Sequence, residues 1–187
     1  MQPDLRIRPA LLADLPVLRA LIDASVRRLQ AQHYTPAQME GALTTVFGVD
    51  TQLIADRTYL LVEYCPAQSE APPVIIACGG WSKRKTLYGA DQWPDRHDDL
   101  LDPRHDAAKI RAFFVHPDWA RRGIGTFLLD ACESAAKAAG FSRFEMGATL
   151  TGAKLFRARG YLPIRTLDVP LCNGESLPII QMEKKTE

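Results

Sequence analysis

Two glycines and two arginines fall close together in the run His116-Pro117-Asp118-Trp119-Ala120-Arg121-Arg122-Gly123-Ile124-Gly125-Thr126. The apolar segment 110–115 before this run is typical of a buried strand, and 123–139 has the apolar spacing of an amphipathic helix. The first N–H groups of a helix have no partner within it, and glycines let a ligand approach the backbone closely. With the guanidinium groups of Arg121 and Arg122 beside them, these amides predict an anion site that suits the diphosphate of a coenzyme.

Two other kinds of phosphate site are compatible with a pair of glycines before a helix. A P-loop needs a lysine and then a serine or threonine after its last glycine, whereas Gly125 is followed by Thr126 and a phenylalanine. A dinucleotide site would use Glu145 for the ribose, but Leu128 stands at its third glycine and a loop with Pro117 separates strand and glycines. The dinucleotide site stays open as the weaker alternative.

The strand end Val115-His116-Pro117 followed by Gly123 and Gly125 resembles the coenzyme-binding core of the GNAT superfamily of acyl-CoA-dependent N-acetyltransferases, specifically over 110–161. One departure is Ala120, which stands where the family pattern has glutamine or arginine. The resemblance implies acetyl-CoA as cosubstrate, no metal, and pantetheine bound where one strand separates from the next. The coenzyme contacts it implies come from Phe114, Val115, Arg121, Arg122, Gly123, Ile124, Gly125, Thr126 and Phe156.

The order of predicted elements describes one α/β domain over 1–187, without repeats or a break in composition. The resemblance further implies a mixed, mostly antiparallel central sheet flanked by helices. Hydrophobic periodicity and turn residues predict strands at 5–8, 58–64, 74–81, 110–115 and 144–148, two more as a hairpin across Asn173-Gly174, and helices at 14–32, 36–48, 123–139 and 152–159.

The implied reaction is direct attack of a neutral amine on the thioester within a ternary complex, with backbone N–H groups near Phe114 and Val115 binding the oxyanion. An alkylamine is almost entirely protonated at pH 7, so a base is expected. Glu145 and Glu63 are the candidates, although both are also explained as ordinary strand carboxylates. Phe156 stands where many relatives have a tyrosine that acts as the general acid, which leaves Tyr161, Tyr88 or water as the proton donor.

A long connection, 83–108, contains most of the clustered aspartates and two of the four histidines. One interpretation is a lid that attracts a cationic acceptor through its carboxylates and covers it with Trp93 or Tyr88. The alternatives are a solvated acidic loop and a metal site built on His97 and His105, which lack a recognised ligand spacing.

Composition gives no sign of disorder, and a formal net charge of +1 gives no broad electrostatic reason to expect nucleic acid or a membrane as partner. The four cysteines have no metal or redox spacing, and no leader or membrane segment is evident, so a cytoplasmic protein with reduced thiols is expected. The leading hypothesis is an N-acetyltransferase for a small-molecule amine. The alternatives are a noncatalytic acyl-CoA-binding regulator and a protein acetyltransferase; the family analogy adds a possible homodimer.

Overall fold

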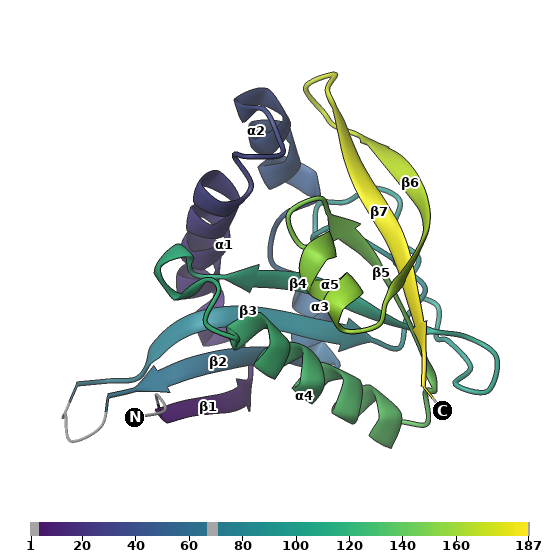
Figure 1. Ribbon diagram of the computed structural model, residues 1–187, viewed down its shortest axis with the longest axis horizontal. Helices are drawn as coiled ribbons and strands as arrows, with labels where there is room; N and C mark the ends of the chain where they lie inside the picture. The colour runs from purple at the N-terminus through teal and green to yellow at the C-terminus, as the bar shows by residue number, and fades with distance from the viewer. Residues whose placement is uncertain (1–3, 67–70, 187) are drawn as a thin grey trace.

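The computed structural model describes residues 4–66 and 71–186 (Figure 1). Its helices are α1 (Leu15–Leu29), α2 (Pro36–Thr45), α3 (Thr51–Ala55), α4 (Ile124–Ala138) and α5 (Ala153–Ala158), with short 3₁₀ turns η1 (Leu12–Asp14) and η2 (Pro117–Trp119). Its strands are β1 (Asp4–Pro9), β2 (Tyr59–Cys65), β3 (Val74–Ser82), β4 (Ala108–Val115), β5 (Arg143–Thr149), β6 (Leu162–Pro170) and β7 (Ser176–Lys185).

The seven strands of the described chain form one sheet in the order β1-β2-β3-β4-β5-β7-β6. Neighbouring strands are antiparallel except β4 and β5, which are parallel. The predicted mixed, mostly antiparallel sheet is therefore confirmed, as is the closing hairpin of β6 and β7. Residues 67–70, between the strands predicted at 58–64 and 74–81, lie outside the described residues.

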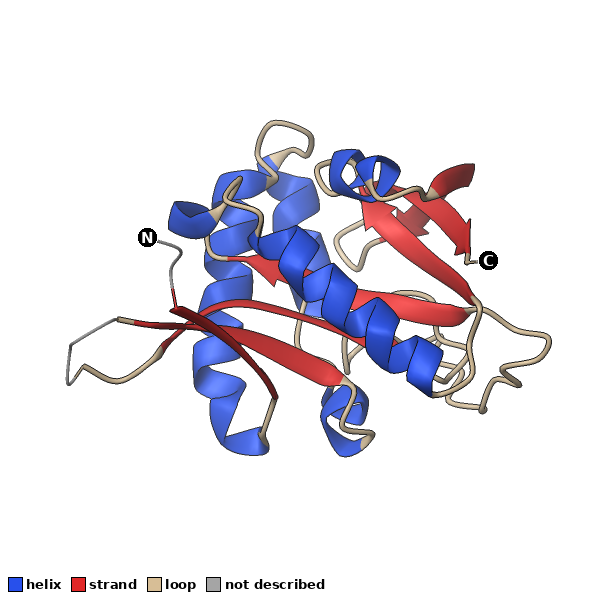
Figure 2. Ribbon diagram, turned by 60° about the horizontal axis from the view of Figure 1, so that its bottom comes forward, coloured by secondary structure: helices blue, strands red, loops and turns tan. Residues whose placement is uncertain are grey.

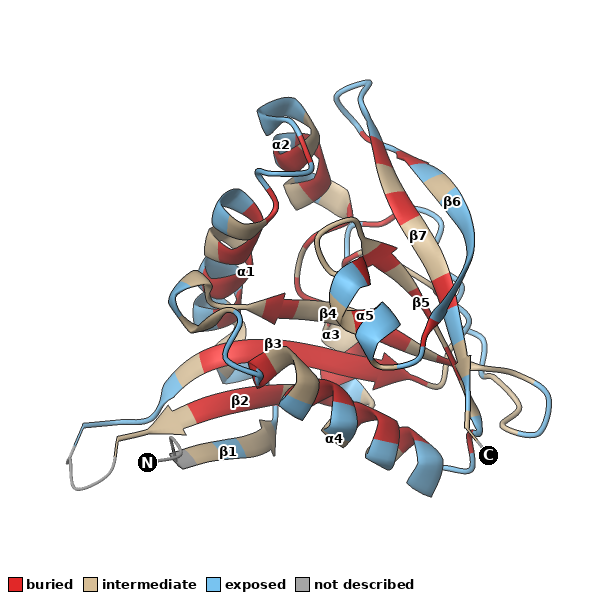
Figure 3. Cartoon of the chain, in the orientation of Figure 1, coloured by how far each residue is buried: buried red, intermediate tan, exposed pale blue. Residues whose placement is uncertain are grey.

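Helices cover both faces of the sheet (Figure 2). On one face α1 buries Leu18, Ile22 and Val26 in a core shared with Phe114 of β4, and on the other α4 buries Leu128 in a core shared with the opposite face of the sheet. Figure 3 shows the result on α4, whose sheet-facing side is buried while its outer side is exposed. No helix in the described ranges is both long and apolar enough to cross a membrane.

Local signals fix several element boundaries as predicted. At the start of α2, Gln38 N donates to Thr35 Oγ1 at 3.1 Å and Thr35 N donates to Gln38 Oε1 at 2.9 Å, a capping box that sets the predicted start at residue 36. Gly140 ends α4 with a φ of 92°, a conformation that favours glycine. Helix α3 was not predicted, because five residues are too few to show a helical period.

Candidate active site

Strands β4 and β5 are paired only where both begin. Their register joins Ala108 to Phe144 and Lys109 to Glu145, and an ion pair between the Lys109 ammonium and the Glu145 carboxylate spans the last joined position. Past this point the strands separate, and a cavity of about 180 Å³ is lined by residues 110–115 of β4 and 146–149 of β5. The separation that the resemblance implied is thus present.

Strand β4 has a bulge where it lines the cavity. Ala112 and Phe113 together oppose only Gly79 of β3, and Ala112 has a φ of 54°, in a region that costs a residue with a Cβ atom roughly 1–2 kcal/mol. A Cβ atom on Gly79 would lie 2.5 Å from Phe113 Cδ2. The Tyr59 hydroxyl donates to Ala112 O at 3.4 Å. The close packing on Gly79 and this hydrogen bond hold the strained backbone beside the cavity.

The N-terminus of α4 reaches the same cavity through Gly125. Gly123 is the residue before the helix, with a φ of 80°, and Phe127 N makes the first helical bond, to Gly123 O at 2.9 Å. The N–H groups between them are therefore not used by the helix. A Cβ atom on Gly125 would lie 2.9 Å from Leu155 Cδ2, so the first turn packs tightly against α5. These free amides at the positive end of a four-turn helix suit a diphosphate.

The residues predicted to bind the coenzyme lie together along this side of the cavity. Phe114, Val115, Gly125 and Phe156 line it, and the remaining predicted contacts lie in the η2–α4 loop and the first turn of α4, namely Arg121, Arg122, Gly123, Ile124 and Thr126. Both arginines are exposed, and the Arg122 guanidinium lies 5.2 Å from the centre of the Trp119 ring. The loop can thus offer two cationic groups to an anion next to the free amides.

Aromatic side chains occupy the place of a tyrosine proton donor. The Phe156 ring lines the cavity and lies edge-on to Phe113, with centroids 6.0 Å apart. Tyr161 is buried, and its hydroxyl donates to Glu133 Oε1 at 3.0 Å, so it does not reach the cavity; burial and the Glu133 charge raise its pKa. Tyr88 does line the cavity, and burial followed by the charge of Asp95 raises its pKa.

The two predicted base candidates do not line the cavity. Glu63 is buried and accepts hydrogen bonds from Arg6 at 2.6 Å and Arg8 at 2.7 Å. Burial raises the pKa of Glu63, but these hydrogen bonds outweigh burial, and the net pKa is below its usual value. Glu145, besides its ion pair, accepts a hydrogen bond from Gln181. Both carboxylates are thus engaged in contacts with cationic or amide groups, and their catalytic roles stay predictions.

The opposite wall of the cavity comes from segments far away in the sequence. Ser25, Leu29 and Gln30 of the α1 region line it, together with residues 46–48 and 87–89. The coenzyme motif gives no information about these residues. Ser25 carried a signal that was missed, because it is a polar residue on the helix face that otherwise buries Leu21, Ile22 and Val26.

Hydrogen bonds join the α1–α2 region to the far end of the sheet. The Tyr34 hydroxyl donates to Pro178 O at 2.7 Å and accepts from Leu150 N at 2.9 Å, and burial raises its pKa to about 12. From the start of α2, Gln38 Nε2 donates to Ser176 O at 2.7 Å. These bonds connect the two sides of the gap between β4 and β5 beyond the cavity.

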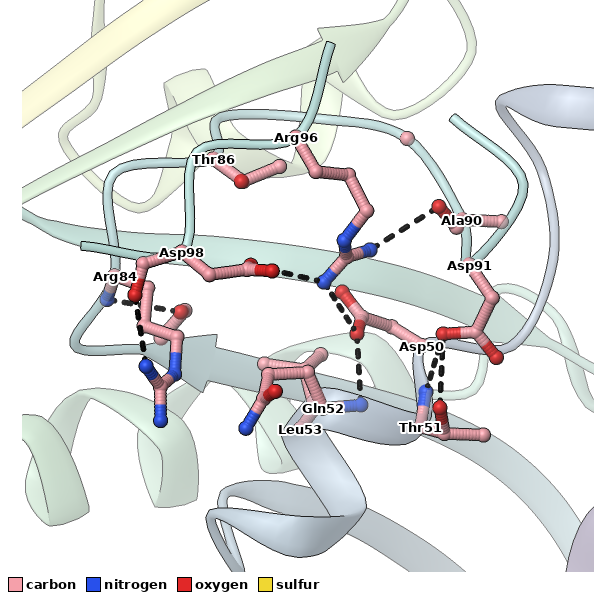
Figure 4. A network of polar contacts seen from close by, with 12 residues as sticks. Asp50, Thr51, Gln52, Leu53, Arg84, Thr86, Ala90, Asp91, Arg96 and Asp98 are labelled. Carbon is pink, nitrogen blue, oxygen red and sulfur yellow. Dashed lines mark hydrogen bonds and ion pairs between the residues drawn. The ribbon is translucent and has the colours of Figure 1, made fainter. Parts of the chain in front are cut away.

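The long connection between β3 and β4 is held against α3 by buried charges (Figure 4). Asp50, which is fully buried, caps α3 by accepting from Gln52 N at 3.1 Å. Its carboxylate also lies 3.1 Å from Arg96 Nη2 of the connection and 2.9 Å from Arg111 Nη2 of β4. Arg96 in turn donates to Ala90 O at 3.1 Å. Because Arg111 also donates to Gly89 O, the network is bonded to the segment 87–89 that lines the cavity.

The acidic groups of this connection are mostly engaged in local contacts. Asp91 accepts from Thr51 N at 2.8 Å, and other carboxylates pair with arginine or lysine side chains or bond to nearby backbone, namely Asp98, Asp99, Asp102 and Asp106. Trp93 is buried against Tyr88, with centroids 5.2 Å apart. Within the described residues no group of three or more histidine, cysteine, aspartate or glutamate side chains is placed to hold a metal. None of these carboxylates is among the described residues that line the cavity, so the acidic cluster does not form its wall.

The model of the Acetyltransferase (GNAT) family matches residues 54–161, more than half of the chain. No curated protein sequence matches the chain significantly.

Among solved structures, a GCN5-related N-acetyltransferase from Rhodopseudomonas palustris is similar at 26% identity and a TM-score of 0.67, over 99% of this chain and 96% of the other. PaiA N-acetyltransferase from Thermoplasma acidophilum, in complex with coenzyme A, is similar at 13% identity and 0.58, over 97% and 99%. YncA from Salmonella typhimurium, a putative acetyltransferase with its cofactor acetyl-CoA, is similar at 15% and 0.58, over 98% and 95%. At 13% and 15% identity, the similarity to the last two structures shows a shared fold.

Proposed function

Because the chain belongs to the GNAT acetyltransferase family, we propose that it transfers an acetyl group from acetyl-CoA to the primary amine of a small molecule. The observation that carries the proposal is the cavity between β4 and β5, which joins the free amides of α4 on one side to the α1 wall on the other. Acetyl-CoA would enter from the α4 side and the amine from the α1 side. The two reactants would then meet in one ternary complex.

The proposed chemistry is attack of the neutral amine nitrogen on the thioester carbon. A C–N bond forms, the carbonyl oxygen becomes an oxyanion, and the C–S bond then breaks to release coenzyme A as a thiolate. His116 N donates to Ile76 O on β3 at 2.8 Å, and neighbouring amides of a strand point to opposite edges, so Val115 N–H is directed toward the gap. We assign this amide to the oxyanion, an interaction typically worth about 3 kcal/mol.

The leaving thiolate needs no strong acid. With a thiol pKa of about 8.5, coenzyme A is a competent leaving group near neutral pH, which is compatible with Phe156 in the cavity wall. Among the described lining residues, Tyr88 carries the phenol hydroxyl that could return a proton to sulfur.

Deprotonation of the amine is assigned to water. None of the described residues that line the cavity is an aspartate, glutamate or histidine. A base role for Glu145 or Glu63 would have to run through a chain of water molecules, and their glutamine variants test it by their effect on kcat.

The bonds beyond the cavity favour a small acceptor over a protein. Tyr34 and Gln38 connect the α1–α2 region to the β5–α5 turn and to β7, across the gap where an extended peptide would otherwise lie. The cavity of about 180 Å³ suits an amine of modest size and the acetylated end of the coenzyme.

The test is release of coenzyme A from acetyl-CoA with a panel of small amines, amino acids and short peptides, in the wild type and Gly125→Asp. The new carboxylate would repel the diphosphate and collide with Leu155, so release should be abolished. Ser134→Asp is the matched control, because it adds the same charge to the same helix at an exposed position that does not line the cavity. Its release should equal that of the wild type.

Three outcomes decide between functions. Release that depends on a small amine and fails in Gly125→Asp supports the transferase. Acetyl-CoA binding in calorimetry without release from any amine favours the noncatalytic regulator, and release with peptides alone overturns the small-molecule acceptor.

A further inference from the structure

The α1 wall of the cavity offers no free charge. Its side chains are mostly apolar, including Leu29, Val46, Phe47 and Leu87, and Ile179 of β7 adds to the apolar lining of the cavity. Arg111 is the one charged residue among the described lining residues, and its guanidinium is engaged by Asp50 and by Gly89 O. A second ammonium group on the acceptor would therefore be buried without a counterion, which is strongly unfavourable.

One buried polar group of this wall has an unused oxygen. Gln30 is 5% exposed and lines the cavity, and its Oε1 has no hydrogen-bond partner among the described residues. Buried polar atoms are nearly always hydrogen bonded, so an unpaired oxygen on a residue that lines a cavity points to a ligand that supplies the partner. The Gln30 backbone is fixed at the end of α1, where its carbonyl accepts from His33 N at 2.9 Å and Tyr34 N at 3.0 Å.

A second unused oxygen belongs to the other side of the same cavity. Thr151, which follows β5, lines the cavity, and its buried Oγ1 also has no partner among the described residues. Ser25, 3% exposed, lies on the α1 wall one turn before Leu29. The cavity thus combines an apolar surface with a few hydrogen-bonding groups, the usual composition of a small-molecule site.

Resting on the proposed function, we propose that the acceptor is a primary amine on a single apolar or aromatic body without a second charge, and that the Gln30 amide selects it. The Gln30 side-chain oxygen accepts a hydrogen bond from an N–H of the amine. The nitrogen lone pair is then left free for the thioester. Gln30 is thereby a specificity-determining residue of the α1 wall.

A matched pair of acceptors tests whether a second charge on the acceptor is excluded. Pentylamine and 1,5-diaminopentane have the same carbon chain and differ by one amino group, so kcat/KM for the diamine should be at least about 100-fold lower, since its second ammonium loses hydration without gaining a partner. Equal use of the two amines would overturn the inference while leaving the transferase intact.

Two variants test Gln30 itself. Gln30→Met keeps the volume and removes the amide, so KM for pentylamine should rise about 10-fold, the usual value of one hydrogen bond, with KM for acetyl-CoA unchanged. Gln30→Glu keeps an oxygen at the site but adds a charge beside the reacting nitrogen, so it should favour the ammonium form and lower kcat for pentylamine. Gln32→Met is the control at an exposed neighbour and should change neither constant.

Binding separates this inference from the proposed function. Calorimetry of pentylamine with the coenzyme A-saturated protein measures the affinity of the amine at the α1 wall without turnover. Binding that Gln30→Met weakens, in the absence of transfer, would sustain the inference and overturn the transferase. No binding of pentylamine, or binding that Gln30→Met leaves unchanged, would overturn the inference.

Discussion

Removal of the buried Asp50 charge should be among the most damaging single changes to this protein. Asp50 is 0% exposed, and the side chains of Arg111 and Arg96 are 3% and 14% exposed. Asp50→Asn would leave two neighbouring cations without the carboxylate between them. Because asparagine is as good a helix N-cap as aspartate, the cap of α3 is kept and the change isolates the charge.

Loss of one partner of a buried ion pair costs about 3–5 kcal/mol, a large part of the 5–15 kcal/mol that is typical of a domain. Asp50 Oδ2 has no aligned hydrogen bond within the described residues, so its attraction to Arg111 at 2.9 Å is mainly Coulombic. Urea unfolding at pH 7 should therefore show a free energy of unfolding lower by about 3–5 kcal/mol in Asp50→Asn.

Two further variants make this reasoning refutable. Asp50→Asn with Arg111→Met should recover part of the loss, because the second change removes the cation left without a partner. Asp99→Asn, at a surface pair with Lys85, should cost less than about 1 kcal/mol. A loss below about 1 kcal/mol for Asp50→Asn, or no recovery in the double variant, would show that the network contributes little to stability.

Three more outcomes follow from the same contacts. Glu63 has a lowered pKa, so its stabilising effect is present above pH 4.5 and lost as the pH falls through the folded pKa. In urea titrations, Glu63→Gln should therefore lower the free energy of unfolding by about 1–2 kcal/mol at pH 7 and change it little at pH 2. The kcat of this variant should equal that of the wild type. Gly79→Ala should push Phe113 out of place and lower both the thermal midpoint and acetyl-CoA affinity in calorimetry, at a cost of about 1–3 kcal/mol; unchanged values would show that the bulge tolerates the extra methyl group. Since no described carboxylate or histidine lines the cavity, kcat/KM for an alkylamine should rise about tenfold per pH unit toward the amine pKa near 10.4, whereas a plateau near pH 7 would reveal an enzymatic base.

The coenzyme side of the site could be predicted from the sequence because its determinants are local. A strand, a turn and a helix start lie within about twenty consecutive residues, and Gly123 and Gly125 mark the backbone that must stay open. The capping box of α2 and the glycine that ends α4 are also local features, because each depends on residues that are near neighbours in the chain.

The acceptor side could not be predicted, because it is assembled by tertiary packing. Gln30, Phe47 and Tyr88 meet in one cavity although they are far apart in the chain, and no short pattern joins them. Glu63 shows the same limit, since its residue type suits a base, but Arg6 and Arg8 come to it from a different strand. Only the register of β1 with β2 reveals that pairing.

The two joined positions of β4 and β5 have a consequence for how the molecule unfolds. Strands β1 to β4 share a continuous ladder of hydrogen bonds, as do β5, β7 and β6, but little backbone bonding connects the two ladders. We therefore expect each ladder to open as a cooperative unit of its own, linked to the other mainly by side-chain packing in the two shared cores. A ligand that bonds to both free edges acts as a substitute strand, so it would merge the two units and slow amide hydrogen exchange in parts of the sheet that it never touches.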